Sequence, residues 1–308
     1  MSASHWFSKS YLDSRKRFLT SINELSDLGY KVKTDHLLIE AKGSDQEELT
    51  IDIAVVGSLE SEKMLISSSG VHGVEGYPGS AIQLSIIDEM KKTIMFADVC
   101  IIFIHSINPY GMSWLRRVNE NNVDLNRNFL EKHEGEPEGY ELIDKFVNAP
   151  GLPKKFDPTF YIQGIQLLVR YGFTNIKQWF AQGQYTRPKS LQYGGDKLQE
   201  GPSLIIEWLK KNLQKTKEIF AIDLHTGLGP SGFDTILIPE DISDEKYKLL
   251  ISLFNGHVTS LDPLKGVGYK ITGDIHAGLV SEFPSINWIC ITQEFGTFKP
   301  MSVLKSLR

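Results

Sequence analysis

One glycine-rich segment joins an apolar run to a helical run and places a histidine close to a glutamate. His72 and Glu75 lie in LISSSGVHGVEGYPGSA, between Gly70, Gly73 and Gly76. The preceding KMLISSS is short and β-prone, and the following YPGSAIQLSIIDEMKK has apolar side chains at helical spacing. Because glycine permits tight backbone bends, both side chains can converge on one ion at this strand-to-helix turn.

The spacing of His72 and Glu75 is a weak indicator on its own. A second pair with this spacing, His133 and Glu136, lies in EKHEGEPEG, whose charges, glycines and proline indicate a solvated loop. A hydrolytic zinc site typically takes two histidines and one carboxylate and leaves a position for water or substrate. His225, at the end of the apolar run in IFAIDLHTG, is the candidate third ligand, since strand ends are where sites are assembled.

The other histidines carry weaker signals. His105 ends the buried-looking run VCIIFIH, which favours packing at a strand end, or a contact behind the ligands, over ligation. His5, His36, His257 and His276 have no companion at ligand spacing.

The composition is that of an ordinary soluble enzyme, with 41% hydrophobic and 23% charged residues. A formal net charge of -5 gives no basis for binding nucleic acid, because an acidic surface repels phosphates. No run approaches the roughly 18 apolar residues of a membrane span, and no signal-like region is visible, so we expect no membrane partner and a cytoplasmic protein. Cys100 and Cys290 lie in apolar runs, which favours buried free thiols over a disulfide.

The order of apolar runs predicts an α/β fold in a single domain over residues 1–308. An initial helix precedes VKTDHLLIEAKG and LTIDIAVVG, which we expect to form an antiparallel pair. Strands and helices then alternate, which favours a mixed, twisted sheet with parallel central strands and helices on both faces. A largely helical insertion is expected at about 139–214.

Further motifs follow the glycine-rich turn in a fixed order: NPYGM, RRVNENNVDLNRNF, GQYTRPKSLQYGG, DLHTGLGP and QEFGT. Together with GVHGVEGYPGSA they resemble the M14 zinc carboxypeptidase superfamily, which includes the succinylglutamate desuccinylase and aspartoacylase enzymes, from about Lys63 to Phe298. Within it, the chain is most similar to the DUF2817 group. The resemblance implies a zinc-carboxypeptidase-like fold, one bound Zn²⁺ ion, and a small peptide or acylated amino acid as substrate.

By this resemblance, His72, Glu75 and His225 hold the zinc ion and Glu294, in ICITQEFGT, is the general base. The chemistry suits these residue types, because zinc lowers the pKa of a bound water towards about 7 and a nearby carboxylate can accept its proton. The apolar run INWICIT before Glu294 indicates a buried strand rather than a charged edge.

The segment NENNVDLNRNF supplies further expected roles. The resemblance places Asp124 behind the metal, where a carboxylate accepts a hydrogen bond from the far nitrogen of the first ligating histidine. Asn126 and Arg127 would bind the substrate's terminal carboxylate, since a planar guanidinium can donate two parallel hydrogen bonds. Arg117 would polarise the scissile carbonyl, with the adjacent Arg116 left open as an alternative.

Asp223, two residues before His225, points to the same face if this run is a strand, where it would orient a ligand or cap local structure. Tyr269, in GVGYKITGD, is the candidate for the tyrosine that many carboxypeptidases bring over the substrate. Tyr185 and Tyr193, in GQYTRPKSLQYGG, are rivals. The segment between DLNRNF and DLHTG is rich in aromatic residues, so we expect substrate access to differ from that in digestive carboxypeptidases.

These observations favour a zinc-dependent hydrolase, or metallopeptidase, that cleaves an amide bond next to a free carboxylate, as a carboxypeptidase does. An N-acyl amino acid deacylase of the aspartoacylase type shares the metal site and is the alternative enzyme. A catalytically silent module that binds peptide C-termini is the alternative of another class, although silent relatives of enzymes usually lose a ligand or the base. The sequence does not define the oligomeric state.

Overall fold

The computed structural model describes residues 3–92, 99–149, 151, 157–239, 242–260 and 270–307. Tyr269, the expected substrate-covering tyrosine, lies outside these residues.

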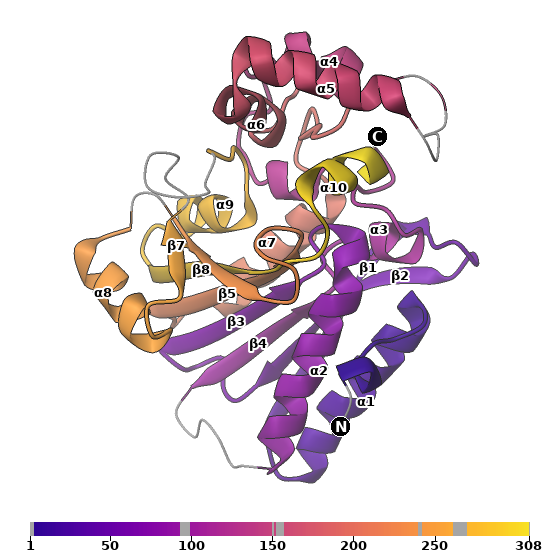
Figure 1. The fold of residues 1–308 in the computed structure, drawn as a ribbon. Coiled ribbons are helices and arrows are strands. Elements are labelled where there is room, and N and C mark those ends of the chain that lie inside the picture. The colour runs from indigo at the N-terminus through magenta and orange to yellow at the C-terminus, as the bar shows by residue number, and fades with distance from the viewer. Residues whose placement is uncertain are drawn as a thin grey trace.

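The described strands form one sheet in the order β1-β2-β4-β3-β5-β8-β6-β7 (Figure 1). The strands are β1 (Val32–Lys42), β2 (Glu48–Val56), β3 (Lys63–Ser69), β4 (Cys100–His105), β5 (Glu218–Thr226), β6 (Asp234–Ile238), β7 (Val258–Ser260) and β8 (Asn287–Phe295). In the centre, β4, β3, β5 and β8 are parallel, and β2 and β6 flank them antiparallel. The sheet is therefore mixed with a parallel centre, and the antiparallel pairing of β1 with β2 is confirmed.

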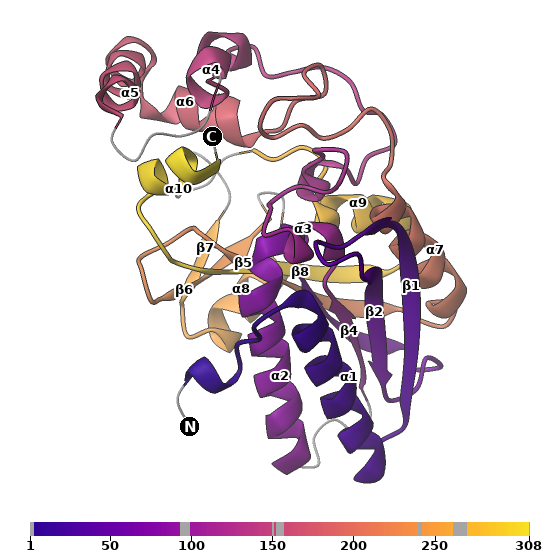
Figure 2. The same ribbon diagram turned by 90° about the vertical axis from the view of Figure 1, so that its right-hand side faces the viewer.

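Helices cover both faces of this sheet (Figure 2). The main ones are α1 (Tyr11–Asp27), α2 (Gly76–Lys92), α7 (Glu200–Asn212), α8 (Asp244–Leu253) and α9 (Ile275–Glu282). Helices α1 and α2 pack on Phe103 of β4, whereas α7 and α9 share the largest core cluster with its neighbour Ile102. Adjacent side chains of a strand point to opposite faces, so the two pairs of helices lie on opposite sides, as the sequence predicts.

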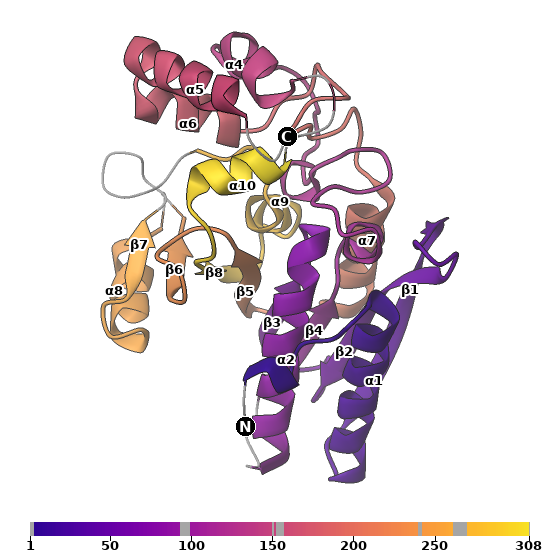
Figure 3. The ribbon, with the colours of Figure 1, turned by 45° about the vertical axis from the view of Figure 1, so that its right-hand side comes forward.

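Three helices of the expected insertion stand above the sheet as a separate layer, which we call the cap: α4 (Tyr140–Val147), α5 (Pro158–Tyr171) and α6 (Phe173–Ala181) (Figure 2). The cap has a core of its own that includes Tyr140, Ile143 and Phe160. Helix α10 (Pro300–Leu307) lies between the cap and the sheet and adds Leu304 to this core (Figure 3). The chain thus returns to the cap after completing the last strand.

Helix α7 also falls within the expected insertion but packs on the sheet instead. Its Trp208 belongs to the largest core cluster, and the Trp208 Nε1 donates a hydrogen bond of 2.8 Å to the Asp35 carboxylate on β1. The helical residues of the 139–214 segment therefore divide between the cap and the cover of the sheet.

Short elements connect the strand ends to the site. These are η1 (Ala3–His5), η2 (Gly73–Glu75), α3 (Pro109–Ser113) and η3 (Leu125–Arg127). Element η2 follows β3, and α3 follows β4, so both lie at the carboxyl ends of parallel central strands. This is the edge of a parallel sheet at which α/β proteins build their sites.

Candidate metal centre and active site

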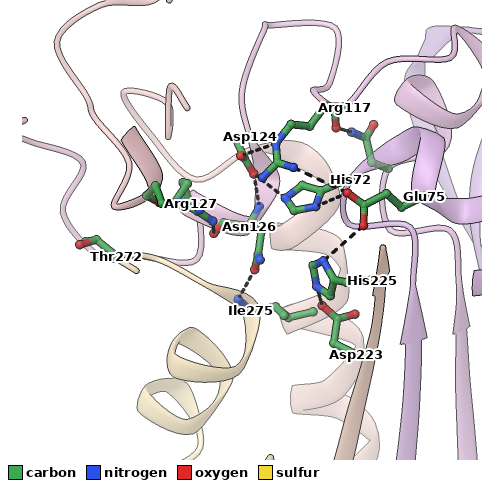
Figure 4. A network of polar contacts seen from close by, with 12 residues as sticks. His72, Glu75, Arg117, Asp124, Asn126, Arg127, Asp223, His225, Thr272 and Ile275 are labelled. Carbon is green, nitrogen blue, oxygen red and sulfur yellow. Dashed lines mark hydrogen bonds and ion pairs between the residues drawn. The ribbon is translucent and has the colours of Figure 1, made fainter. Parts of the chain in front are cut away.

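Two histidines and a glutamate converge at the carboxyl ends of β3 and β5 (Figure 4). His72 caps the amino end of η2, Glu75 ends it, and His225 lies near the end of β5. One ligand atom from each of the three residues lies within 4.8 Å of the others. The His72 Nδ1 is 2.9 Å from one Glu75 oxygen, and the His225 Nδ1 is 3.5 Å from the other.

A tight backbone turn makes this convergence possible. Gly70 has φ of +69°, which reverses the chain directly after β3. At Gly73, an added Cβ would lie 2.1 Å from the backbone carbon of Gly111, so η2 and α3 are in direct backbone contact. The Gly73 and Val74 amides donate hydrogen bonds to the carbonyls of Arg117 and Arg116. The glycine-rich motif therefore fixes the turn that holds His72 and Glu75.

The far nitrogen of each imidazole meets a buried carboxylate. His72 Nε2 is 3.1 Å from Asp124, and His225 Nε2 is 2.5 Å from Asp223. Asp223 in turn accepts a 2.7 Å hydrogen bond from the Ser68 hydroxyl. The carboxylate behind each ring favours a proton on Nε2, which would leave Nδ1, the nitrogen that faces Glu75, free to bind a metal ion.

The donor set fits a divalent metal ion, and zinc in particular. Two imidazoles and a carboxylate are the ligands of many hydrolytic zinc sites. Donor atoms around tetrahedral zinc lie about 3.3 Å apart, close to the 2.9 and 3.5 Å between the Nδ1 atoms and the Glu75 oxygens. The buried carboxylates of Glu75, Asp124, Asp223 and Glu294 also outnumber the guanidinium groups beside them. A cation would offset that excess negative charge when both imidazoles are neutral.

The close packing of charged groups shifts the pKa values of Glu75 and His225. Burial disfavours the charged form of Glu75, but the neighbouring His72 and His225 outweigh it and hold the pKa of Glu75 far below its usual range. Burial opposes the charged form of His225 as well, yet the adjacent Asp223 carboxylate raises the pKa of His225 well above its usual value. The cluster therefore favours positive charge between its carboxylates.

Arg117 is part of this cluster and Arg116 is not. The Arg117 Nε donates a 3.0 Å hydrogen bond to Asp124, and its Nη1 lies 3.6 Å from Glu75 (Figure 4). Arg116 is exposed and contributes its carbonyl to the turn instead. The geometry thus separates two arginines that the sequence left as alternatives.

Glu294 lies beside His225, its register partner on the adjacent strand β8. The side chain is buried within the sheet, and one carboxylate oxygen accepts a 3.3 Å hydrogen bond from the Leu228 amide. Burial raises the pKa of Glu294, and the charge of Glu75 raises it further, while His225 opposes both. A carboxylate with a raised pKa is better matched to accept a proton near neutral pH.

Asn126 and Arg127 are anchored by the backbone around them (Figure 4). The side-chain oxygen Oδ1 of Asn126 accepts a 3.1 Å hydrogen bond from the Ile275 backbone amide at the start of α9. The Arg127 guanidinium donates to the carbonyl of Ala181, at distances of 2.9 and 2.6 Å, and to that of Asn126 at 2.7 Å. A guanidinium carries five N–H groups, more than these contacts use, and Arg127 also lines the site cavity.

The two described tyrosine rivals have structural contacts. The Tyr185 hydroxyl donates hydrogen bonds to the carbonyls of Arg127 and Thr272. Tyr193 is buried in the largest core cluster. These contacts tie together the loops beside the site.

Two cavity-lining residues, Gln192 and His276, were not among the expected site residues, although Gln192 lies in the motif GQYTRPKSLQYGG. The Gln192 Oε1 and the His276 Nε2 are both buried, and among the described residues neither has a hydrogen-bond partner. His276 sits in the first turn of α9, where burial lowers its pKa although the nearby Asp223 and Asp274 carboxylates oppose that shift. It lies far along the chain from the other site residues and has no companion at ligand spacing, so only the fold brings it there.

A cavity of about 1480 Å³ contains the cluster and is lined by His72, Glu75, His225 and Glu294, among others. It continues from the strand ends to the cap and α10. This volume is larger than the 300–1,000 Å³ of most small-molecule sites.

Solved structures share this architecture. Bovine thrombin-activatable fibrinolysis inhibitor, in complex with a tick carboxypeptidase inhibitor, matches with a TM-score of 0.55 at 13% identity, over 98% of this chain and 94% of that one. Carboxypeptidase A from Helicoverpa armigera matches with a TM-score of 0.50 at 13% identity, over 94% and 65%. An aspartoacylase family protein from Mesorhizobium loti is also found, with a TM-score of 0.43 at 16% identity, over 89% and 65%.

The fold and the cluster define the class: an α/β protein with a carboxypeptidase-like fold and a His-Glu-His group at its strand ends. The chain belongs to the DUF2817 family, described as a protein of unknown function, whose model matches residues 7–308. Among proteins with curated descriptions, none matches this chain. Across the described residues, no helix is both long and apolar enough to cross a membrane.

Proposed function

We propose that this protein is a zinc-dependent hydrolase that cleaves an amide bond next to a free carboxylate. The observation that carries the proposal is the cluster itself: three potential ligands within 4.8 Å, with a buried carboxylate behind each imidazole. His72, Glu75 and His225 would hold one zinc ion. When bound, zinc acts as a Lewis acid that polarises a carbonyl and makes water more acidic.

Residues of the chain would transfer the proton, polarise the carbonyl and bind the substrate's carboxylate. Glu294, next to His225 in the sheet, would take a proton from the attacking water and pass it to the leaving nitrogen. Arg117 would place its positive charge beside the scissile carbonyl, since it already lies 3.6 Å from Glu75. Asn126 and Arg127 would bind the free carboxylate from the cavity wall.

A direct test of the general base changes Glu294 to glutamine, which keeps the shape of the side chain but cannot accept a proton. We expect Glu294→Gln to retain its zinc and to lose about 10²- to 10⁴-fold in turnover of amide substrates that carry a free carboxylate. Metal content and turnover should be measured on the same preparation. Undiminished turnover would refute Glu294 as the base, and absence of zinc in the wild type would favour a silent binding module.

A further inference from the structure

The site cavity extends into a region whose chemistry differs from that of the metal cluster. There the wall is formed by the cap and by α10, and we call this region the apolar chamber. Side chains that line it include Leu167, Leu168, Ile176, Phe180, Met301 and Leu304. Figure 3 shows α10 between the cap and the strand ends that carry the cluster.

The wall of the apolar chamber is poor in hydrogen-bonding groups. Of the described cap and α10 residues that line the cavity, Lys177 has the one polar side chain. A peptide in this region would bring an N–H and a carbonyl with every residue, and burying them unpaired is costly. An alkyl chain has no such groups and would gain from the burial.

The part of the cavity wall beside the metal-ligand cluster carries charged and polar groups. Arg117 and Arg127 line it with the metal-ligand cluster, and the unpartnered Gln192 Oε1 and His276 Nε2 are buried in its wall. A ligand that spans these two regions therefore has a compact polar head, carrying the amide and the carboxylate, and a long apolar tail.

We propose, building on the function above, that the substrate is an N-acyl amino acid with a long unbranched acyl chain that fills the apolar chamber. Hydrolysis would consume one water. A C–O bond forms at the acyl carbon, the C–N bond breaks, and the amine takes a proton, so that a fatty acid and a free amino acid are released. No oxidant or reductant is required.

Binding to the Glu294→Gln protein tests this proposal without turnover. The ligands are N-acetyl-, N-octanoyl- and N-dodecanoyl-L-alanine, titrated by calorimetry below their micelle concentrations. Each buried methylene is expected to tighten binding up to about four-fold. We expect the dodecanoyl ligand to bind at least about 100-fold more tightly than the acetyl ligand. A change smaller than about ten-fold would overturn the proposal, as would equally tight binding of free dodecanoate, which lacks the amide and the amino acid.

Two adjacent positions on α5 provide a matched pair of variants. Leu168 lines the cavity, whereas Val169 does not and is 84% exposed. Leu168→Glu should weaken dodecanoyl binding at least ten-fold and leave acetyl binding unchanged, and Val169→Glu should alter neither. Leu168→Trp, which keeps the wall apolar but fills space, should shift the preference to shorter chains. Equal effects of the two glutamate substitutions would place the acyl chain elsewhere.

Turnover by the wild type distinguishes a failure of this substrate proposal from a failure of the proposed hydrolase function. Cleavage of acetylated amino acids or short peptides that depends on Glu294 but not on acyl length would retain the hydrolase and reject the acyl substrate. Tight, length-dependent binding without hydrolysis of any of these amides would reject the hydrolase, and with it the substrate.

Discussion

At the scale of single residues, the candidate metal centre depends on side chains that are not ligands. Asp124 and Asp223 hold the far nitrogens of His72 and His225, and both carboxylates are fully buried. Without them, either imidazole could rotate or change tautomer. Asp223 is the cleaner one to test, because Asp124 also binds Arg117.

Asp223→Asn should therefore weaken zinc binding by about 10- to 100-fold, since an amide cannot hold the imidazole N–H as strongly as a carboxylate. Competition with a chromophoric chelator measures this affinity. Asp52→Asn is the control, because Asp52 is equally buried but pairs with Arg15 and His36 outside the site. Equal zinc affinity in wild type and Asp223→Asn would contradict the positioning role.

His105 illustrates a buried histidine that is structural. It ends β4, stacks on Phe18 at 4.5 Å, and its Nε2 lies 3.1 Å from the hydroxyls of Ser14 and Ser80. Burial lowers the pKa of His105 to about 4. The sequence favoured packing at a strand end as one reading of this residue, and these contacts agree with that reading.

Because folding lowers the pKa of His105, the stability of the protein depends on pH. The unfolded chain binds a proton at His105 near pH 6.5, and the folded chain does so only near pH 4, so stability falls as the pH drops through this window. Relative to His105→Gln, the wild type should lose about 3 kcal/mol more unfolding free energy between pH 7 and pH 4. Urea unfolding across this range measures the difference, and parallel curves would contradict it.

The metal-ligand candidates and the candidate base stand in motifs, but a place in a motif did not by itself reveal every residue of the cavity. His72, Glu75, His225 and Glu294 each follow an apolar run, and the fold brings them to one edge of the sheet. His276 stands in no motif, and Gln192 stands in GQYTRPKSLQYGG, where only the tyrosines were expected near the site. Both residues reach the cavity through the docking of α9 and of the loop before Tyr193.

At the scale of elements, the turn between β3 and α2 was predictable and its neighbours were not. Glycines between a strand-like and a helical run predict a tight turn, and the structure places η2 there. Strands β6 and β7 were not foreseen, because each is short and takes its place by pairing with β8 or with each other. Such pairing depends on sequence-distant partners rather than on local propensity.

The contact between η2 and α3 makes Gly73 the most sensitive position of the turn. Gly73→Ala would drive a methyl group into the Gly111 backbone, which should cost about 1 to 3 kcal/mol and displace His72 and Glu75. The thermal unfolding temperature and the zinc affinity should both fall. Gly201→Ala on α7, where the nearest atom is 3.3 Å away, is the matched control and should leave zinc affinity unchanged. Wild-type zinc affinity in Gly73→Ala would show that the turn does not position the ligands.

At the scale of the whole molecule, a rigid sheet carries the candidate centre and a separate helical layer shapes its cavity. The alternation of strands and helices predicted the sheet and the helices on both faces. The division of 139–214 into cap and α7 was not predictable, because helical periodicity does not reveal which surface a helix covers. Likewise, α10 reaches the cap through contacts of Leu304 that its own sequence does not specify.

Four residues that lie far apart in the sequence are proposed to form one zinc site with its base at one edge of the sheet. Zinc content, measured by plasma mass spectrometry after dialysis, tests it most directly. We predict about one zinc per wild-type chain, little in His72→Ala or His225→Ala, and wild-type content in His133→Ala, which alters the other histidine-glutamate pair. Zinc-free wild type, or equal zinc in all four proteins, would contradict the account.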